Sequence, residues 1–429
     1  MKVAIKTLGC KSNRYESDKL LDGLQELGCE VIELNEGATS FRSRFQDKPD
    51  LLVINTCTVT HIADRKSRQA VRSYKNAYPE LKVFVFGCGS NVAPEDYEKM
   101  EEVTAIAEDT DAVLKLIAEE IDNDTSCEYE GADLTQGKRT RAMVKIQDGC
   151  NSYCSYCIIP RARGPEYSFP SKQILEDVKK KEAAGFKEIV LTGINIGEWK
   201  EDDKELGDLF EYLIENTEAM RFRVSSIEPK NFSQKLFKLF KGGRLCPHMH
   251  MSLQSGSDSV LKRMRRHYAT DLFEEVCKKF REVVPDMGLT TDVIVGFPGE
   301  TDEEFEETCR FVQEVGFLKL HVFPYSKRKN TVAFHMDGHI DEAVKKVRAK
   351  RLREVSDQMG MAFIESQLGG TFDVLVEEIN DDIGRGYTPN YIPVQFSCSK
   401  GVKVNHFVPV ELKSCEGGIV FGETKKAAN

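Results

Sequence analysis

The stretch AMVKIQDGCNSYCSYCIIPRARG (142–164) holds three cysteines, Cys150, Cys154 and Cys157, directly after a short apolar run. This C-x3-C-x2-C spacing lets three thiolates from one loop surround one face of a metal cluster. Thiolates favour iron–sulfur clusters or zinc. Structural zinc sites take four ligands, and no fourth cysteine or histidine lies nearby in the sequence. The segment therefore predicts an iron–sulfur cluster with one iron that has no protein ligand.

A series of alternating strands and helices surrounds and follows this loop. We expect its strands at 142–150, 188–197, 221–229, 249–256, 290–299 and 319–326, with helical stretches between them. Six such units predict an α/β barrel or partial barrel of parallel strands, with its active site at the carboxyl ends of the strands. Glycines in the strand-end sequences TGINIG, SLQSGS and GFPGE let backbone come close to a ligand.

The first 135 residues predict a separate α/β domain. Short apolar strands at 2–9, 30–34, 51–59, 82–88 and 103–108 alternate with amphipathic stretches, as in a doubly wound parallel sheet with helices on both faces. Three of these strands end near Cys10, Cys57 and Cys88. Physical chemistry alone leaves two interpretations open: a second three-cysteine cluster, or three unconnected buried cysteines.

Two changes of composition divide the chain. Residues 122–142 are polar and rich in turn formers, which predicts a linker. From about Ser366, short alternating strands without a sizeable helix predict a small antiparallel β-barrel. We therefore expect three domains, at 1–135, 136–365 and 366–429.

Composition indicates a globular cytoplasmic protein with reduced thiols. The chain has 429 residues, 13 cysteines and a net charge of −10. No apolar run is long enough to span a membrane, so no membrane partner is expected. The acidic balance argues weakly against a nucleic-acid partner, although basic stretches such as 344–353 permit a local basic track.

Four segments, in order along the chain, resemble the radical SAM methylthiotransferases. They are TLGCKSNRYES (7–17), INTCTVTHIADRKSRQ (54–69), VFGCGSN (85–91) and IQDGCNSYCSYCIIPRARG (146–164). The resemblance implies a radical S-adenosylmethionine (SAM) cluster on Cys150, Cys154 and Cys157. It also implies an auxiliary [4Fe–4S] cluster on the three cysteines of the first domain, and a C-terminal TRAM barrel that binds RNA.

The resemblance also implies SAM contacts, whose alternatives are ordinary turn, capping and core roles. Tyr156 is expected near the adenine, Gly193 and Asn195 near the methionyl group, and Ser225 and Glu228 near the ribose. Gln254 and Val295 are further candidates.

The implied reaction consumes two equivalents of SAM. Its target is an aromatic C–H without an acidic proton, which a general base cannot activate but a radical can. One SAM methylates sulfur held at the auxiliary iron, and the second supplies the radical that removes the hydrogen.

Within the family, the chain resembles the branch that modifies C2 of N6-threonylcarbamoyladenosine at position 37 of tRNA. Lys11, Ser12 and Asn13 after the first cysteine differ from the patterns of two other branches, which act on isopentenyladenosine at the same position or on an aspartate of a ribosomal protein. A non-enzymatic iron–sulfur protein that binds RNA or senses redox state is the alternative from another class. The implied partners are the tRNA anticodon stem-loop and an electron-donor protein.

Substrate contacts are expected from four side chains. Arg161 and Arg163 form a pair that could bind the substrate carboxylate in fork geometry, with a phosphate contact or an ordinary surface pair as the alternative. Asn13 and Asn55 flank the auxiliary cysteines, where they order the cluster or touch substrate, unless they make only local loop hydrogen bonds.

The predicted C-terminal barrel is itself acidic, with eight acidic against six basic residues over 366–429. RNA binding would then be local. The candidates are the helix at 344–353, or a surface of Lys400, Lys403, Tyr387, Tyr391 and Phe396, where bases can stack on aromatic rings.

Overall fold

The computed structural model describes residues 1–34, 48–122, 140–218, 220–398 and 401–425. It divides into two compact units. The first contains residues 1–136, 149–166 and 326–334, and the second contains residues 137–148, 167–325 and 335–429. Most of the predicted linker, with Cys127, Lys138 and Arg139, lies outside the described residues.

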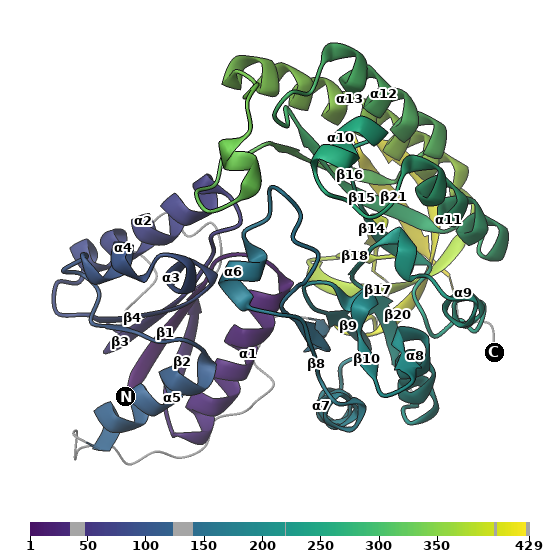
Figure 1. Cartoon of the computed structure of the whole chain (residues 1–429). Coiled ribbons are helices and arrows are strands. Elements are labelled where there is room, and N and C mark those ends of the chain that lie inside the picture. The colour runs from purple at the N-terminus through teal and green to yellow at the C-terminus, as the bar shows by residue number, and fades with distance from the viewer. Residues whose placement is uncertain (35–47, 123–139, 219, 399–400, 426–429) are drawn as a thin grey trace. The chain divides into compact units, whose positions relative to one another are not determined.

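A five-stranded parallel sheet forms the centre of the first unit (Figure 1). Its strands, in the order β2-β1-β3-β4-β5, are β1 (Lys2–Thr7), β2 (Glu30–Leu34), β3 (Leu51–Thr56), β4 (Lys82–Gly87) and β5 (Ala105–Ile106). The helices are α1 (Lys11–Glu26), α2 (His61–Ala77), α3 (Cys88–Val92), α4 (Pro94–Glu98) and α5 (Thr110–Asp122).

Side-chain alternation along the strands gives this sheet two separate cores. Val3 and Ile5 of β1 belong to a buried cluster with residues of α1 and α5, whereas Ala4 belongs to a cluster with residues of α2 and α4. Successive strand residues point to opposite faces, so helices cover both faces. The predicted doubly wound sheet is confirmed.

The second unit contains the parallel strands of the predicted partial barrel. They are β6 (Arg141–Lys145), β9 (Glu188–Thr192), β12 (Arg221–Val224), β13 (Ser226–Ile227), β14 (His248–Gln254), β15 (Gly288–Val295) and β16 (Lys319–Pro324). Strands β6, β9 and β12 form one sheet, and β13 to β16 form the next. Strand β12 continues into β13 after a break at Ser225, so six strand positions follow one another, as expected.

Helices and short hairpins connect these strands. The helices are α7 (Ser171–Ala183), α8 (Leu206–Glu215), α9 (Gln234–Phe240), α10 (Asp258–Arg263), α11 (Thr270–Val283), α12 (Asp302–Val315) and α13 (Glu342–Ser366). The short strands are β7 (Gln147–Asp148) paired with β8 (Tyr167–Ser168), and β10 (Lys200–Glu201) paired with β11 (Lys204–Glu205). Short 3-10 turns occur at Ile196–Glu198, Pro229–Asn231 and Val332–His335.

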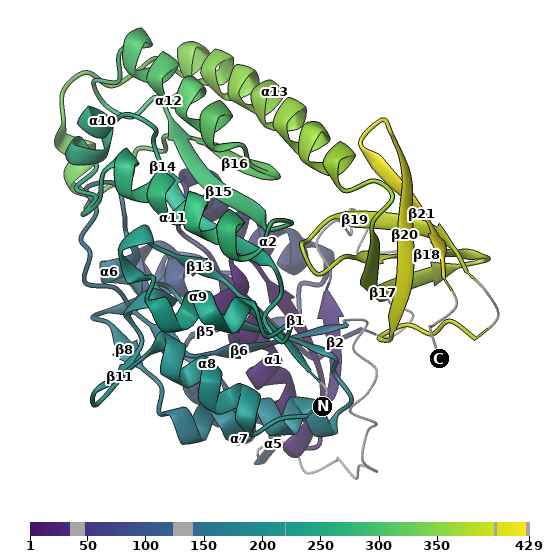
Figure 2. The same ribbon diagram turned by 90° about the vertical axis from the view of Figure 1, so that its right-hand side faces the viewer.

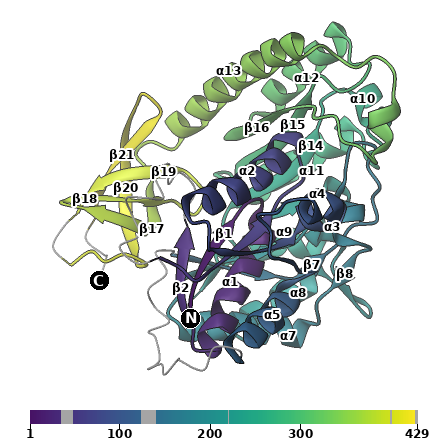
Figure 3. The same cartoon turned by 90° about the vertical axis from the view of Figure 1, so that its left-hand side faces the viewer.

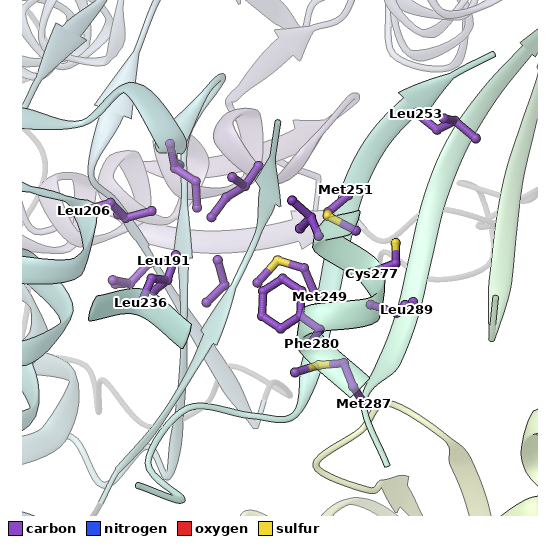
Figure 4. Close-up of a cluster of buried hydrophobic side chains, with 14 of the residues drawn as sticks. Leu191, Leu206, Leu236, Met249, Met251, Leu253, Cys277, Phe280, Met287 and Leu289 are labelled. Atoms are coloured by element: carbon purple, nitrogen blue, oxygen red, sulfur yellow. The ribbon is translucent and has the colours of Figure 1, made fainter. Parts of the chain in front are cut away.

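The core of the second unit lies between the parallel strands and their helices. Figure 4 shows Met249 and Met251 of β14 and Leu289 of β15 near Phe280 of α11. Helix α11 presents Phe273, Val276, Cys277 and Phe280 to this core on one face. The residues that alternate with Met249, Met251 and Leu289 along β14 and β15 point to the opposite face of the sheet.

The C-terminal strands form a closed barrel at the end of the long helix α13 (Figures 2 and 3). They are β17 (Thr371–Asn380), β18 (Ile383–Tyr387), β19 (Pro393–Ser397), β20 (Phe407–Glu416) and β21 (Ile419–Thr424). Four pairings are antiparallel, but β19 pairs with β21 in parallel. The expected barrel is thus present, but one of its pairings is parallel. Strand β20 pairs with β17 instead of β19, and β21 then lies between β20 and β19.

A buried carboxylate joins the amino ends of the parallel strands to the barrel. Glu188 of β9 accepts hydrogen bonds from Nε of Arg221 at 2.6 Å and Nε of Arg223 at 2.7 Å. The same arginines donate to barrel carbonyls, Arg221 to Asp373 at 2.9 Å and Arg223 to Pro389 at 3.0 Å. Burial alone would raise the pKa of Glu188, but Arg223 and Arg221 outweigh it and lower it to about 2.

No helix in the described part of the chain is long and apolar enough to cross a bilayer.

We expect Glu188→Gln to lower the free energy of unfolding by about 3–5 kcal/mol, because it leaves buried arginines without their anion. Urea unfolding of the full chain measures this loss. Glu306→Gln is the matched control, because it removes an exposed ion pair with Arg351 and should cost less than about 1 kcal/mol.

The same comparison has a pH dependence. A lowered carboxyl pKa contributes stability above the unfolded value of 4.5 and loses it as the pH falls toward 2. The difference in stability between wild type and Glu188→Gln should therefore shrink over that window. A difference that stays constant would contradict the role of the charged carboxylate.

Candidate functional site

Three cysteines of the first unit stand at the same edge of its sheet. Cys10 follows β1 and precedes α1, Cys57 follows β3, and Cys88 follows β4 and begins α3. Strands β1, β3 and β4 are neighbours and run parallel. Their carboxyl ends therefore meet, and Cys10 is exposed while Cys57 and Cys88 are buried.

Two buried asparagines bind the cysteine loops to one another. Asn13 donates from Nδ2 to Oδ1 of Asn55 at 2.7 Å and to the carbonyl of Thr56 at 3.0 Å. The thiol of Cys10 lies 3.3 Å from Oδ1 of Asn13. Both asparagines are at most 1% exposed, a position that suits holding the cysteines rather than contacting a substrate.

A glycine before Cys10 allows its loop to approach Cys57. Gly9 has a φ of +120°, and a Cβ built there would lie 3.1 Å from Cβ of Cys57. A side chain at this position would be strained and would crowd the second cysteine. The close approach of the two loops therefore depends on glycine.

The buried thiols of this group are held neutral by their surroundings. Burial raises the pKa of Cys57 above its ordinary value and raises the pKa of Cys88 to about 12. Metal ligands must be thiolates, so the charge needed to stabilise them would come from the bound metal. Three thiols from adjacent strand ends are a suitable donor set for an iron–sulfur cluster.

Arg163 connects the C-x3-C-x2-C loop to these cysteines within the first unit. It lies at the end of α6 (Ile159–Arg163) and donates from Nε to Sγ of Cys88 at 3.2 Å. Its Nη1 donates to Glu16 at 2.6 Å, and its Nη2 donates to Oδ1 of Asn13 at 3.1 Å.

These contacts differ from the expected pairing of Arg163 with Arg161 around a substrate carboxylate. The guanidinium of Arg163 is already bound to the carboxylate of Glu16, which fills its fork. Only Arg161 is exposed. Sequence reasoning did not identify Glu16 as this partner.

The C-x3-C-x2-C loop is closed by backbone contacts at its base. The N–H of Cys150 donates to the carbonyl of Gly164 at 3.3 Å. Gly149 has a φ of +65°, and a Cβ there would lie 1.9 Å from the carbonyl oxygen of Pro165, so only glycine fits. Cys154 is buried, and Cys150 and Cys157 are half-buried.

The tip of the same loop is also fixed. The N–H of Cys157 donates to the carbonyl of Cys154 at 3.0 Å, and the N–H of Ala333 donates to the carbonyl of Ser155 at 2.7 Å. Tyr156 lies half-buried between the last two cysteines. The three thiols thus come from one short loop that is held at both base and tip.

In the second unit, the loop after β9 is held by a residue that the sequence did not single out. Oε1 of Gln147 accepts the N–H groups of Ile194 at 3.1 Å and Asn195 at 2.8 Å. A Cβ at Gly193 would lie 2.6 Å from the carbonyl oxygen of Gln147. Gln147 stands in the quoted QDGC stretch, but nothing in its type or spacing marks it.

Asn195 carries an unpaired polar group. Its Nδ2 is buried and has no hydrogen-bond partner among the described residues. An unsatisfied buried donor is costly, so this amide is suited to a ligand that accepts a hydrogen bond.

The other SAM candidates also lie at carboxyl ends of strands. Ser225 occupies the break between β12 and β13, and Glu228 is buried and bound to Arg266 at 2.9 Å. Gln254 ends β14 with a φ of +70°, a conformation that is uncommon for a non-glycine residue. Val295 ends β15 with its side chain in the hydrophobic core, which leaves only its backbone for a ligand.

The aromatic candidates for RNA binding on the barrel are engaged within the second unit. Phe396 is 2% exposed and belongs to the barrel core. Tyr387 and Tyr391 stack on each other at 4.9 Å, and Arg141 lies over both rings. Of the two lysine candidates, Lys403 is exposed, and Lys400 lies outside the described residues.

Several cations of the basic helix α13 form ion pairs within the second unit. Lys345 binds Glu342 at 2.7 Å, and Arg348 binds Glu300 at 2.6 Å. Arg351 forms an ion pair with Glu306. These three cations are therefore engaged, whereas others on the same helix, such as Lys346, are exposed to solvent.

Comparisons with known proteins agree with this architecture. The Radical SAM superfamily matches residues 144–312, and the Uncharacterized protein family UPF0004 matches residues 2–108. Among solved structures, a radical S-adenosylmethionine methyltransferase, TsrM, from Kitasatospora setae has a TM-score of 0.57 at 13% identity. That match covers 94% of this chain and 83% of the other, and at this identity it supports the fold alone.

Curated relatives match almost the whole chain. The threonylcarbamoyladenosine tRNA methylthiotransferase MtaB of Chlamydia pneumoniae is 36% identical over 97% of this chain and 96% of its own length. The protein of the same name from Bacillus subtilis is 36% identical over 98% of this chain and 95% of its own. A tRNA-2-methylthio-N(6)-dimethylallyladenosine synthase of Endomicrobium trichonymphae is 31% identical over 99% of this chain and all of its own.

Identity at this level across nearly full length, together with the match of residues 144–312, establishes the family. The chain belongs to the radical SAM methylthiotransferases, enzymes that use a [4Fe–4S] cluster and SAM.

Proposed function

We propose that this chain adds a methylthio group to C2 of N6-threonylcarbamoyladenosine at position 37 of tRNA, giving 2-methylthio-N6-threonylcarbamoyladenosine. The observation that carries the proposal is the group of Cys10, Cys57 and Cys88 at one sheet edge, in addition to the C-x3-C-x2-C loop. A second cluster with an open iron would give the enzyme a place to hold the sulfur that it transfers. The choice of nucleoside rests on the names of relatives such as those of Chlamydia pneumoniae and Bacillus subtilis.

In this proposal, Cys150, Cys154 and Cys157 hold the radical cluster. With SAM bound at its open iron, such a cluster supplies a 5′-deoxyadenosyl radical, which can remove a hydrogen atom from an unactivated carbon. The contribution of the chain is to fix the three thiols in one closed loop. Gly149 and the hydrogen bond between Cys150 and Gly164 do this at the base of the loop.

We assign SAM contacts to the strand ends of the second unit and to Tyr156. The unpaired amide of Asn195 would donate to SAM, and Gly193 would allow its close approach. Ser225 and Glu228 would contact the ribose, with Arg266 holding the carboxylate of Glu228 in place. Gln254 and the backbone of Val295 complete the set.

Cys10, Cys57 and Cys88 would hold the auxiliary [4Fe–4S] cluster, whose open iron would carry the sulfur to be delivered. Two equivalents of SAM are then consumed, one as methyl donor and one as radical source. Arg163 would donate a hydrogen bond to the sulfur of Cys88, and donors of this kind tune the reduction potential of a cluster. Asn13 and Asn55 would position the loops that carry the cysteines.

The three segments 1–135, 136–365 and 366–429 would carry the auxiliary cluster, the radical chemistry and RNA binding, respectively. Partners in this proposal are the tRNA anticodon stem-loop and an electron-donor protein. With Tyr387 and Tyr391 engaged by Arg141, the exposed Lys403 is the remaining described barrel candidate for contact with RNA.

A second candidate substrate is dimethylallyladenosine, also called isopentenyladenosine, at the same tRNA position. The 31% identical relative of Endomicrobium trichonymphae is named for that reaction and matches equally well in length. The cysteine groups serve both substrates alike, so only the nucleoside itself distinguishes them.

The substrate is tested in cells. We expect tRNA from a deletion strain to lose 2-methylthio-N6-threonylcarbamoyladenosine and to accumulate the unmethylthiolated nucleoside, as measured by mass spectrometry. Complementation with the wild-type chain should restore the product. Loss of the methylthio form of isopentenyladenosine instead would transfer the assignment to the second candidate.

The two cysteine groups are tested by separating SAM cleavage from sulfur transfer. Cys57→Ala should retain formation of 5′-deoxyadenosine but abolish methylthiolation, because only the auxiliary ligand is removed. Cys29→Ala is the matched control, since Cys29 is a buried core cysteine of the same unit and its removal should preserve both reactions. Equal loss of both reactions in Cys57→Ala would argue against separate clusters.

The role of Arg163 is tested by Arg163→Lys, which removes the Nε donor to Cys88 and the fork on Glu16. We expect methylthiolation to fall by about 10–100-fold, while iron content and 5′-deoxyadenosine formation are retained. A redox titration followed by electron paramagnetic resonance should show a lower potential for the auxiliary cluster only. Arg65→Lys, at an exposed position on α2, is the control, and an unshifted potential in Arg163→Lys would refute the tuning role.

A further inference from the structure

Three side chains with metal-ligand chemistry come together on one sheet of the second unit. His250 of β14, Asp292 of β15 and His321 of β16 each offer one ligand atom, and these atoms all lie within 4.8 Å of one another. Nε2 of His250 is 3.3 Å from Oδ2 of Asp292. The ring centroids of His250 and His321 are 5.5 Å apart.

The register of three neighbouring parallel strands produces this cluster. His250 is paired with Thr290, and Asp292 is paired with His321. The residues adjacent to them along the strands, such as Met249 and Met251, point into the core beneath α11 (Figure 4). Because strand side chains alternate, the cluster lies on the face of the sheet opposite that core.

A hydrogen bond fixes the orientation of one imidazole. Nδ1 of His250 is 2.9 Å from Oγ1 of Thr290, so its Nε2 faces Asp292. Histidines that bind metals commonly have their second ring nitrogen held by such a partner.

The cluster is accessible from solvent. The side chain of Asp292 is 30% exposed, and His321 is exposed, so an ion can enter. Asp292 stands three residues before the end of β15, a distance of about 10 Å along the strand. The cluster therefore lies away from the strand end at Val295, whereas Gln254 is paired with Val293, the residue next to Asp292.

We propose that His250, Asp292 and His321 bind a divalent first-row transition-metal ion such as zinc. Two imidazoles and one carboxylate are a common donor set for such ions, and three protein ligands leave a coordination position for water or an anionic ligand. Thr290 is a positioning residue that holds His250. The site uses none of the cysteines, and none of its three ligands is one of the proposed SAM contacts.

The test uses the full chain with its iron–sulfur clusters reconstituted, and with iron and sulfide counted. The protein is incubated with zinc and desalted, and retained zinc is measured by mass spectrometry. We expect about one zinc ion per chain for a site of this type. Zinc-edge X-ray absorption should show nitrogen and oxygen ligands near about 2.0 Å, with no sulfur near about 2.3 Å.

Variants identify the ligands. His321→Ala and Asp292→Asn should each reduce retained zinc to background, and Thr290→Val should weaken zinc binding by about 10–100-fold in competition with a chelator. His406→Ala removes an exposed histidine of the barrel and should bind zinc like the wild type. Circular dichroism confirms that each variant is folded.

Measurements on the wild-type protein are sufficient to overturn the proposal. Absence of retained zinc in the folded wild type, or sulfur ligation in its absorption spectrum, would overturn it. Zinc retained equally by His321→Ala would overturn it as well.

Discussion

The buried carboxylate of Glu188 is the constraint on which the second unit depends. It stands at the first residue of β9, and two arginines at the start of β12 surround it. The same arginines hold barrel carbonyls, so the barrel is attached at the amino ends of the parallel strands. In α/β barrels of parallel strands, catalytic residues lie at the carboxyl ends of the strands, and contacts at the amino ends contribute to stability. The ionic attachment therefore leaves the strand ends with Gly193, Ser225 and Gln254 available for ligands.

In the first unit, Arg163 attaches the C-x3-C-x2-C loop to the sheet domain. It comes from the loop of the C-x3-C-x2-C motif and bonds to Cys88, Glu16 and Asn13. The loop is thus part of the compact unit that contains the first sheet, although in sequence it directly follows β7 of the second unit. Both cysteine groups belong to one folded body, and a guanidinium that comes from the loop of one group donates a hydrogen bond to a cysteine of the other.

The sequence predicted the features that depend on local spacing or on strand period. Cys150, Cys154 and Cys157 come from one loop, as their spacing indicates. For Cys10, Cys57 and Cys88 the strand pattern predicted three neighbouring strand ends but left open whether they form one group, and only the family resemblance implied a cluster. The sequence did not predict which distant partner a charged or aromatic side chain contacts. Arg163 finds Glu16 147 positions away, and Tyr391 stacks under Arg141 and Arg223. Neither pairing has a period or motif that a single sequence reveals. The parallel pairing of β19 with β21 was likewise not predictable, because the strand pattern does not say in which order the strands lie in the barrel.

The charge distribution shows why a count of basic residues is a poor guide to an RNA-binding surface in this chain. Many cations of the chain are consumed internally: Arg221 and Arg223 on Glu188, Arg348 on Glu300, and Arg163 on Glu16. Counting basic residues therefore overstates the charge that α13 can offer to phosphate. A protein with such paired cations gains little from a broad electrostatic surface. Recognition of an RNA loop by this chain would then depend on a few exposed positions and on the shape of the modified base, so its binding should be less sensitive to salt than that of a basic RNA-binding domain.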